Sequence, residues 1–543
     1  MTMRDVVIIG SGFGGAVMAA RLAAALEAEG KSSPARVLVL EKGIDPSGSF
    51  DARSDGAALN AQGNRFRQTL DPKYLADIAE LHTDAAGAYR PGTPSMNVIS
   101  GKGLGGGSNV YDAVSLRAPS DAFEQTRDGA RLWPAAYTRA ALDPYYARVE
   151  AMLRVHRLAW TDASVPHWQL ATKRDFVFAE GCRRIGLTAA PLKVATNEDK
   201  NEGWWNQGQR FEGRQSLYKN YLGLARDHGA EFWTGCDVQR IAPTRDGYVV
   251  SLIDRRGGGA LIIDVECKLL IVAGGSVGSS ALLLRSQDAF RDYDGARALS
   301  DQLGKRVSGN GDYGVSGTVG RAYEYEVQGF AGKPMSSFCP TLFAEHKFIL
   351  IPFYAAPLYL TLGQPSTLLR PRDASALGRA STDAAAGERD WGAAYKERLA
   401  TFGSRMLTMG CLAFDACEGE VYLQGDVPRV SWRETTRETE ARWSKAVETM
   451  GRIYSALGGE MYLDTYRQGG TVNTAHPLGG CRMNAVVDDC GEVAHNPNLF
   501  VVDGAILPSA LGVNPSLTIA AVAESIADRL LSGRQTRALG ERL

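Results

Sequence analysis

The feature that most restricts the possible folds is a glycine-rich turn close to the N-terminus. Residues 6–9 read Val-Val-Ile-Ile, which is typical of a strand buried on both faces of a parallel sheet. Residues 10–15, Gly-Ser-Gly-Phe-Gly-Gly, follow directly and fit the pattern G-x-G-x-x-G. Residues 16–26 are rich in alanine and predict a helix, and residues 36–41 predict a second buried strand. The chain therefore opens with a βαβ unit, which indicates an α/β fold.

This first turn predicts a site for the pyrophosphate of a dinucleotide. Glycines allow the tight turn, the close approach of phosphates and the close packing of helix on strand, while the helix start favours negative charge. Glu41 ends the second strand, where an acid would hold ribose hydroxyls, although its spacing from Gly10 exceeds the usual ~20 residues. A strand–helix turn without a ligand is the alternative. The predicted contacts are Gly10, Gly12, Phe13, Gly14, Gly15, Glu41 and Lys42.

Two further glycine clusters extend the predicted site. Residues 101–109 contain five glycines close together, so the chain there can pass flush against a flat or charged group. A flexible loop is the alternative, which the following Val110-Tyr111 disfavours. Residues 273–280 follow a predicted buried strand over 269–273 and would complete the nucleotide site, although taken alone they mark only a helix start. The predicted contacts are Gly103, Gly105, Gly106, Gly107, Ser108, Asn109, Ala273 and Gly274.

The C-terminal region combines a histidine-proline pair with an asparagine-proline pair. His476-Pro477 is followed by two glycines, and Asn514-Pro515 opens a predicted helix that runs to about residue 531. Asn514 is a good helix N-cap and Pro515 a good first helical residue. Simple capping by Asn514 and a satisfied core position for His476 are the alternatives. Beside three glycine clusters, the two pairs together predict an active site.

Composition excludes several classes of protein. The 543 residues exceed what one core usually supports, and the net charge of −1 without a basic stripe argues against nucleic acid as a partner. No apolar run reaches the length of a transmembrane segment, and an apolar strand begins too early for a signal sequence. The eight cysteines are scattered, with no C-x-x-C pair, which predicts no metal site and a reducing, cytoplasmic setting.

These motifs resemble those of the glucose–methanol–choline (GMC) oxidoreductases, and within them most closely the bacterial non-covalent cholesterol oxidases. The resemblance implies a Rossmann-like domain that binds FAD without a covalent bond, together with a substrate-binding domain. Residues 404–410 contain no acid where those oxidases carry a carboxylate for isomerisation, so the resemblance does not extend to steroid specificity. The matching segments are Ile9–Gly15, Gly103–Ser108, Ala273–Leu284, His476–Cys481 and Asn498–Glu524.

The resemblance also implies a reaction and roles for residues near the C-terminus. An alcohol CH–OH group would become a carbonyl by hydride transfer to flavin N5, and electrons would then pass to oxygen or another acceptor. His476 would be the acid/base that faces the hydroxyl, and Asn514 its partner beside the flavin. Asp503 would lie by the ribityl chain or the pyrophosphate. The remaining contacts predicted in this region are Gly504, Pro515 and Ser516.

The order of elements predicts a domain built from separated pieces. Buried strands over 269–273 and 499–503 resemble the N-terminal ones but lie far along the chain, and a hairpin is predicted with strands 249–253 and 261–263. A helix is predicted over 145–155, after Asp143-Pro144. We assign residues 1–45, 96–125, 225–320 and 461–543 to the FAD-binding domain, and residues 46–95, 126–224 and 321–460 to an interleaved substrate-binding domain.

The substrate prediction is a bulky, mostly apolar alcohol. It rests on central apolar and aromatic residues, with the core of the second domain as the alternative explanation. Two other functions stay open, namely a non-redox lyase that keeps FAD as a structural group and a carrier protein with a vestigial nucleotide site. The residues behind the substrate prediction are Phe348, Ile349, Leu350, Phe353, Tyr354 and Tyr359.

Overall fold

The fold was analysed in a computed structural model. It describes residues 3–28, 36–45, 79–82, 95–162, 164–166, 169–196, 214–294, 297–324, 326–327, 333, 335–353, 404–432, 436–462, 471–533 and 542. Tyr354 and Tyr359 lie outside these ranges. Within them, no helix has both the length and the apolar character needed to cross a membrane.

The largest sheet has seven strands and contains the predicted nucleotide-binding strands. Its parallel part has the order β10-β2-β1-β13-β23, in which β13 lies between the N-terminal strand β1 and the C-terminal strand β23. All of β2 and the last four residues of β1 are buried, as expected for β-branched runs covered on both faces. The strands are β1 (Arg4–Ile9), β2 (Val37–Glu41), β10 (Glu231–Thr234), β13 (Leu261–Val272) and β23 (Leu499–Val501).

The two strands predicted over residues 261–263 and 269–273 are one strand, β13. Its first half pairs antiparallel with β12 (Tyr248–Asp254), which confirms the hairpin, and β12 pairs with β11 (Cys236–Pro243). Its second half pairs in parallel with β1 and β23. None of its first four residues is buried, buried and unburied residues then alternate, and the last four are all buried. This change of environment within one strand made it look like two.

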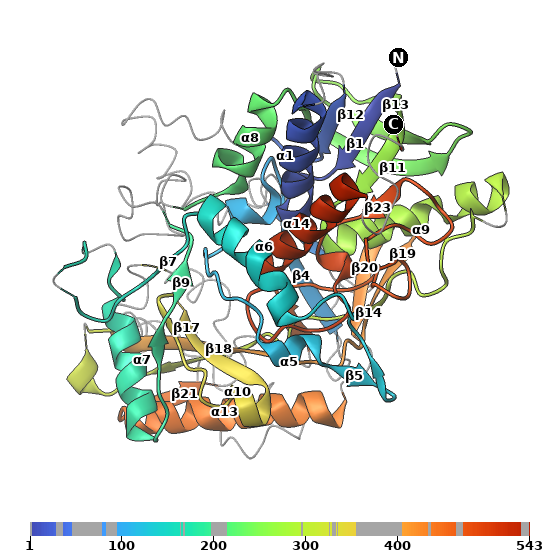
Figure 1. The fold of residues 1–543 in the computed structure, drawn as a ribbon. Coiled ribbons are helices and arrows are strands. Elements are labelled where there is room, and N and C mark those ends of the chain that lie inside the picture. The colour runs from blue at the N-terminus through green and yellow to red at the C-terminus, as the bar shows by residue number, and fades with distance from the viewer. Residues whose placement is uncertain are drawn as a thin grey trace.

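Helices cover the sheet, and two of them join the chain ends. α1 (Phe13–Ala28) packs against α14 (Ser516–Ser532) and α8 (Tyr221–Asp227), and Figure 1 shows α1 and α14 side by side. α9 (Gly275–Tyr293) follows β13 and packs on β11. These strand–turn–helix units confirm the predicted α/β class.

The helix predicted from residue 145 begins earlier. α6 spans Arg139–Met152 and contains Pro144. Thr138 is its N-cap, because the Thr138 side chain accepts a hydrogen bond of 3.1 Å from the backbone N–H of Ala141. This cap sets the helix start ahead of the proline, which the helix accommodates.

Two smaller sheets complete the described part of the molecule. A six-stranded sheet has the order β14-β19-β20-β4-β22, with β3 beside β4. A four-stranded sheet has the order β17-β18-β15-β21, and α13 (Arg437–Ala456) and α7 (Lys173–Arg184) pack against it. In Figure 1, α13 lies at the end of the molecule opposite the two chain termini. The strands are β3 (Ala79–His82), β4 (Ser95–Gly101), β14 (Lys305–Val307), β15 (Tyr313–Thr318), β17 (Phe348–Phe353), β18 (Met406–Ala413), β19 (Gly419–Gln424), β20 (Val427–Trp432), β21 (Glu460–Tyr462) and β22 (Thr471–Thr474).

Short elements connect these layers. They are η1 (Gly106–Asn109), α5 (Ser120–Phe123), β5 (Thr126–Arg127), β6 (Ala130–Arg131), β7 (His156–Arg157), β8 (Ala190–Pro191), β9 (Lys193–Val194), η4 (Leu217–Lys219), η6 (Arg321–Tyr323), β16 (Ser337–Phe338), α10 (Phe343–His346) and η9 (Gly504–Ile506).

Strand β17 lies between two hydrophobic cores. Ile349 packs into the large core that contains the seven-stranded sheet, whereas Phe348 and Leu350 pack into a second core with α13 and α7. All three side chains are buried. This burial supports the alternative explanation, that these residues form core, and gives no evidence that they line a substrate pocket.

Candidate active site

Three turns meet at the carboxyl ends of β1, β13 and β23, and their glycines make this contact possible. A Cβ atom on Gly10 would lie 2.3 Å from the carbonyl oxygen of Ala273, and one on Gly14 would lie 1.6 Å from that of Val502. One on Gly15 would lie 2.1 Å from the carbonyl oxygen of Gly10. Three predicted glycines are thus required by packing alone, at the edge of a parallel sheet where ligands commonly bind.

The second glycine cluster packs directly on the first turn. A Cβ on Gly106 would lie 2.7 Å from the Cα of Gly12. The Ser108 hydroxyl donates to the Gly105 carbonyl at 2.7 Å and accepts from the backbone N–H of Leu217 at 3.0 Å. The cluster is therefore held in place, and the alternative of a flexible loop is wrong.

Glu41 ties these two glycine segments together. Its buried carboxylate accepts hydrogen bonds from the backbone N–H groups of Ser11 (3.2 Å), Gly43 (2.9 Å) and Gly103 (3.2 Å), and from the Ser11 hydroxyl (2.5 Å). Burial raises the pKa of Glu41, and these hydrogen bonds oppose that rise. Lys42, the next residue, is half-exposed and its ammonium group lies 2.5 Å from the Glu80 carboxylate.

Asp503 joins the ends of β13 and β23. Its carboxylate accepts hydrogen bonds from the backbone N–H groups of Ala505 and Gly275, both at 2.7 Å, and from the Ser279 hydroxyl at 2.5 Å. Gly275 is the first residue of α9, so Asp503 satisfies a free N–H at that helix start. Gly504 accepts from the backbone N–H of Gly479 at 3.0 Å, which brings the His476 segment to this edge.

An open cradle remains between these packed turns. A Cβ atom on Gly12, Gly107 or Gly275 would meet nothing within 4 Å. The side-chain oxygens Oδ1 of Asn109 and Asn514 are buried and have no hydrogen-bond partner among the described residues. Buried polar atoms are normally paired, so these two oxygens mark positions where a ligand would supply a donor.

His476 and Asn514 are brought together by the fold. Asn514 Nδ2 lies 3.1 Å from His476 Nε2. The N-cap of α14 is Pro515, with no side-chain hydrogen bond, and Ser516 is its first residue. The capping role predicted for Asn514, with Pro515 inside the helix, is therefore wrong, because the Asn514 amide contacts the imidazole instead.

The sequence analysis missed the group on the other side of the imidazole. His476 Nδ1 lies 2.9 and 2.8 Å from the two carboxylate oxygens of Asp312. Asp312 also accepts from the Thr474 hydroxyl at 2.9 Å and from the backbone N–H of Ala475 at 3.3 Å. Burial lowers the pKa of His476, but Asp312 and the more distant Asp112 outweigh that effect and raise it above the usual value.

A buried loop over residues 308–312 carries Asp312. The Asp415 carboxylate accepts from the Ser308 hydroxyl (2.9 Å) and from the backbone N–H groups of Gly309 (3.0 Å) and Gly311 (2.9 Å). Burial raises the pKa of Asp415 to about 6, although hydrogen bonds partly oppose this. The run Ser-Gly-Asn-Gly-Asp was the signal for this loop, since its residue types are typical of tight turns.

The same loop also holds the segment before Asn514. The Asn310 side chain accepts from the backbone N–H of Leu511 at 2.8 Å and donates to the Val513 carbonyl at 2.8 Å. One short loop thus positions both His476, through Asp312, and Asn514, through Asn310.

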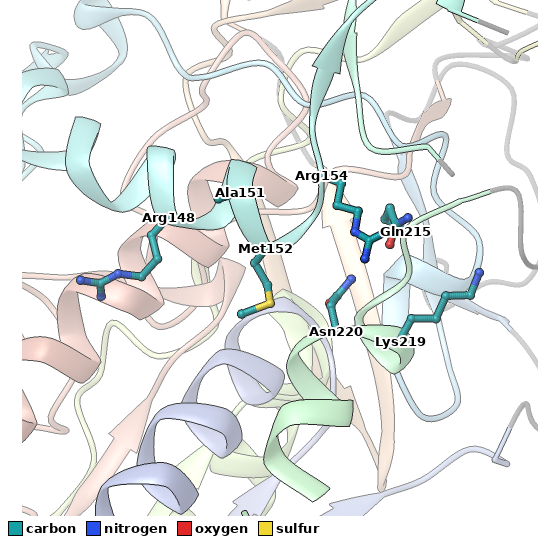
Figure 2. Close-up of a pocket in the computed structure, with 7 residues that line it drawn as sticks. All are labelled: Arg148, Ala151, Met152, Arg154, Gln215, Lys219 and Asn220. Atoms are coloured by element: carbon teal, nitrogen blue, oxygen red, sulfur yellow. The ribbon is translucent and has the colours of Figure 1, made fainter. Parts of the chain in front are cut away.

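A separate cavity of about 710 Å³ lies beside the end of α6. Its lining includes the cationic side chains of Arg148, Arg154 and Lys219. Figure 2 shows that Arg148 points away from Arg154 and that Lys219 extends away from Asn220. Arg148 is also paired with Glu524 at 2.8 Å. The cationic groups do not converge on one point, and we assign no ligand to this cavity.

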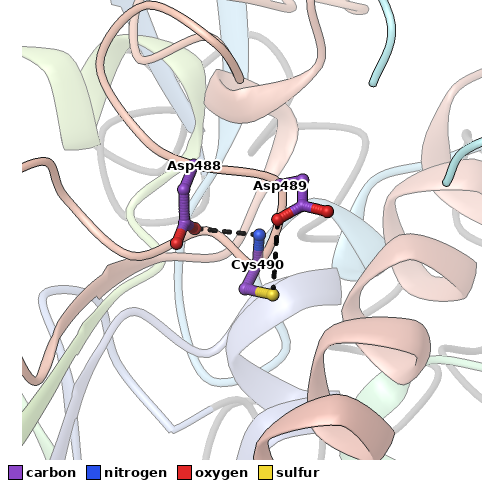
Figure 3. A group of neighbouring side chains, drawn as sticks. All are labelled: Asp488, Asp489 and Cys490. Carbon is purple, nitrogen blue, oxygen red and sulfur yellow. Dashed lines mark hydrogen bonds between the residues drawn. The ribbon is translucent and has the colours of Figure 1, made fainter. Parts of the chain in front are cut away.

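A small acidic group at Asp488, Asp489 and Cys490 forms a local turn (Figure 3). Asp488 accepts from the backbone N–H groups of Cys490 and Glu492, both at 2.8 Å. The Cys490 thiol donates to Asp489 at 3.6 Å, and Asp489 lies 3.5 Å from Arg529. These contacts account for the group, and it carries no metal proposal.

Known proteins are similar in sequence to this protein along most of the chain. Two family models described as GMC oxidoreductase match residues 5–290 and residues 417–523. A long-chain-alcohol oxidase of Arabidopsis thaliana is 24% identical, over 98% of this chain and 68% of its own length. A cholesterol oxidase of Mycobacterium tuberculosis is 26% identical, over 96% of this chain and 90% of its own length.

Solved structures show the same fold. The pyridoxine 4-oxidase from Mesorbium loti superposes with a TM-score of 0.62 at 18% identity, covering 97% of this chain and 98% of that one. The first family model alone spans more than half of the residues. This chain therefore belongs to the GMC oxidoreductase family and is an FAD-dependent oxidoreductase.

Proposed function

We propose that this enzyme oxidises the CH–OH group of an alcohol to a carbonyl, with His476 as the acceptor of the hydroxyl proton. The observation that carries the proposal is the 3.1 Å contact between His476 Nε2 and Asn514 Nδ2. The two side chains lie beside the turns that meet at the sheet edge, and Asp312 contacts the far side of the imidazole. Relatives named as a long-chain-alcohol oxidase and a cholesterol oxidase support a reaction at an alcohol group.

The residues present fit FAD. The open space at Gly12 and Gly107 would admit a pyrophosphate beside the start of α1, whose first N–H groups have no partner within the helix. The start of α14 at Pro515 and Ser516 would face the flavin ring, where its positive end favours negative charge. FAD, when bound, accepts the hydride that leaves the carbinol carbon.

The chain's own residues handle the proton. His476 Nε2 is the basic atom that would accept the hydroxyl proton, and Asn514 Nδ2, which lies beside it, would donate a hydrogen bond to the substrate oxygen. The neighbouring Asn310, Asp312 and Asn514 are all buried, whereas 20% of the His476 side chain is exposed to solvent. A general base at this position is expected to contribute about 10²–10⁴-fold to the rate.

We predict that FAD is bound without a covalent link. The resemblance places the tethering histidine of covalent members beside the second glycine cluster, and residues 97–112 contain no histidine. Acid precipitation of the purified protein should therefore release all of the yellow chromophore into the supernatant. Flavin that stays with the precipitate would contradict this prediction.

Glu41→Ala is expected to weaken FAD binding by roughly 1.5–3 kcal/mol, as for lost hydrogen bonds to a charged group. If the only role of Glu41 is to bind the ribose of FAD, the stability of the FAD-free protein should not change. Because Glu41 also accepts from Ser11 and Gly103, we expect the FAD-free protein to melt at a lower temperature as well. Titration with FAD and thermal unfolding measure the two effects. Native affinity together with native stability would show that Glu41 has neither role.

We propose that the substrate is a bulky, mostly apolar alcohol. The names of two relatives, a long-chain-alcohol oxidase and a cholesterol oxidase, support this. Anaerobic titration with long-chain alcohols, sterols and small polyols, followed by the visible spectrum, tests the proposal. Reduction by polyols alone would contradict the apolar substrate, and no reduction by any alcohol would favour the lyase alternative.

Two further predictions remain part of this proposal. We retain the assignment of the FAD-binding and substrate-binding segments, although the six-stranded sheet joins strands from both sets. We also propose a reducing, cytoplasmic setting, which the eight buried free thiols support.

A further inference from the structure

The contacts of His476 define which of its ring nitrogens carries the proton. A carboxylate can only accept, so Nδ1, which lies 2.9 and 2.8 Å from the two oxygens of Asp312, carries a proton. In the neutral imidazole Nε2 then carries the lone pair, and it lies 3.1 Å from Nδ2 of Asn514. This is the form of histidine that can accept a proton at Nε2.

The Asp312 carboxylate is itself held firmly. The Thr474 hydroxyl and the backbone N–H of Ala475 both donate to its Oδ2. The Thr474 hydroxyl also accepts from the backbone N–H of His476 at 2.9 Å, so the histidine and its carboxylate share an anchor. Only 11% of the Asp312 side chain is exposed to solvent. Solvent therefore screens its charge only weakly.

The groups that face His476 come from four segments. Asp312 precedes β15 and Thr474 ends β22, while Asn514 precedes α14 and is uncharged. Asp112 follows η1 and acts on His476 through space, in the same direction as Asp312. Both of the charged groups that act on the imidazole are carboxylates, and Asp312 is the one in contact.

We propose that Asp312 is the positioning residue that makes His476 a base in the reaction proposed above. It holds the proton on Nδ1, so that Nε2 keeps the lone pair that Asn514 Nδ2 contacts here and that the substrate hydroxyl would take instead. It also stabilises the positive imidazolium that then forms. In that step the O–H bond of the alcohol breaks and an N–H bond forms at Nε2, while Asp312 remains ionised. The role of Asp312 rests on the proposed function, because it acts only through His476.

Titration of His476 in the FAD-loaded protein tests the coupling without any substrate. The chain has seven histidines, so proton and carbon signals of isotope-labelled imidazoles can be followed by NMR. The His476 signal is the one missing from His476→Gln. Its midpoint in the native protein should lie above the usual value of about 6.5. In Asp312→Asn we expect it to move down by about 1 pH unit or more, because the charge that favours the imidazolium is gone.

Asp415→Asn is the matched control. It removes a carboxylate that contacts the loop carrying Asp312, but the Asp415 carboxylate bonds to Ser308, Gly309, Gly311 and Cys417 rather than to His476. We expect Asp415→Asn to lower the melting temperature and to leave the His476 midpoint in place. An equal shift in both variants would show that disturbance of the loop, and not contact with Asp312, controls the imidazole, and would overturn the proposal.

Anaerobic flavin reduction then tests the role in the reaction. The native rate should fall as pH drops through the His476 midpoint, because the protonated ring cannot accept the hydroxyl proton. Asp312→Asn should lower the rate at high pH by about 10²–10⁴-fold, because its amide can favour the wrong tautomer. Asp312→Glu keeps the charge and should recover part of the rate. The titration midpoint of His476 in Asp312→Glu should also stay above the usual value. Asp312→Glu therefore serves as the test variant if Asp312→Asn loses FAD.

The outcomes separate this proposal from the proposed function. A native midpoint and a native rate in Asp312→Asn would overturn the role of Asp312 while alcohol oxidation stands. A His476 midpoint that falls to the usual value in Asp312→Glu would also overturn the role of Asp312. A native protein that no alcohol reduces would refute the function, and with it the catalytic role of Asp312, even where the NMR shift is seen.

Discussion

His476→Ala is expected to slow anaerobic flavin reduction by about 10²–10⁴-fold while FAD remains bound. Removal of the imidazole takes away the proposed base and leaves Asn514 and Asp312 without the group that they both contact. Stopped-flow reduction with the best alcohol of the panel measures the effect, and the absorbance ratio of flavin to protein shows whether FAD is retained.

His476→Gln should lose less than the alanine variant, since an amide can still hold the hydroxyl without moving a proton. His228→Ala is the control, because His228 lies after α8, where it pairs with Glu27. It should reduce its flavin at the native rate. A fully loaded His476→Ala protein that is reduced at the native rate would rule out His476 as the base.

Gly14→Ala is expected to be the most damaging small substitution in the nucleotide site. Its Cβ would lie 1.6 Å from the Val502 carbonyl oxygen, so α1 must move away from the turn that ends β23. Overpacking of this kind costs about 1–3 kcal/mol and occasionally more, and here the displaced backbone also lines the cofactor cradle. We expect a lower melting temperature and little retained FAD.

Gly12→Ala is the matched control, because the same added methyl group meets no atom within 4 Å. The stability of the FAD-free protein should stay within about 0.5 kcal/mol of the native value. FAD binding should nevertheless weaken, since the methyl group would occupy space intended for the pyrophosphate. Native FAD affinity in Gly12→Ala, or native stability in Gly14→Ala, would show that the cradle is placed wrongly.

The sequence by itself determined the nucleotide half of the molecule. β1, α1 and β2 follow from local patterns, because β-branched runs buried on both faces and a G-x-G-x-x-G turn leave few other structures possible. The same holds for the turn after β13 and for α14. Strand β13 is the exception, since its two halves have different surroundings and looked like two strands.

Only the tertiary structure decided the roles of residues whose sequence patterns fitted two different roles. Asn514 before a proline suits a helix cap and an active site equally well, and its contact with His476 at 3.1 Å distinguishes them. Phe348 and Leu350 read equally well as a pocket or a core, and packing against α13 and α7 makes them core. A local sequence pattern limits the roles that a residue can have. The residues that pack around it in the fold determine which of these roles it has.

Asp312 was beyond the reach of local patterns altogether. Its turn, Ser-Gly-Asn-Gly-Asp, is visible in the sequence, but its partner His476 lies far along the chain, and the intervening chain forms most of the second core. The loop is placed by the buried Asp415, whose role also depends on distant contacts. Sequence patterns identify the groups that can carry a proton. Which carboxylate orients the histidine depends on how separate segments pack, because a contact of 2.8 Å is set by the whole fold.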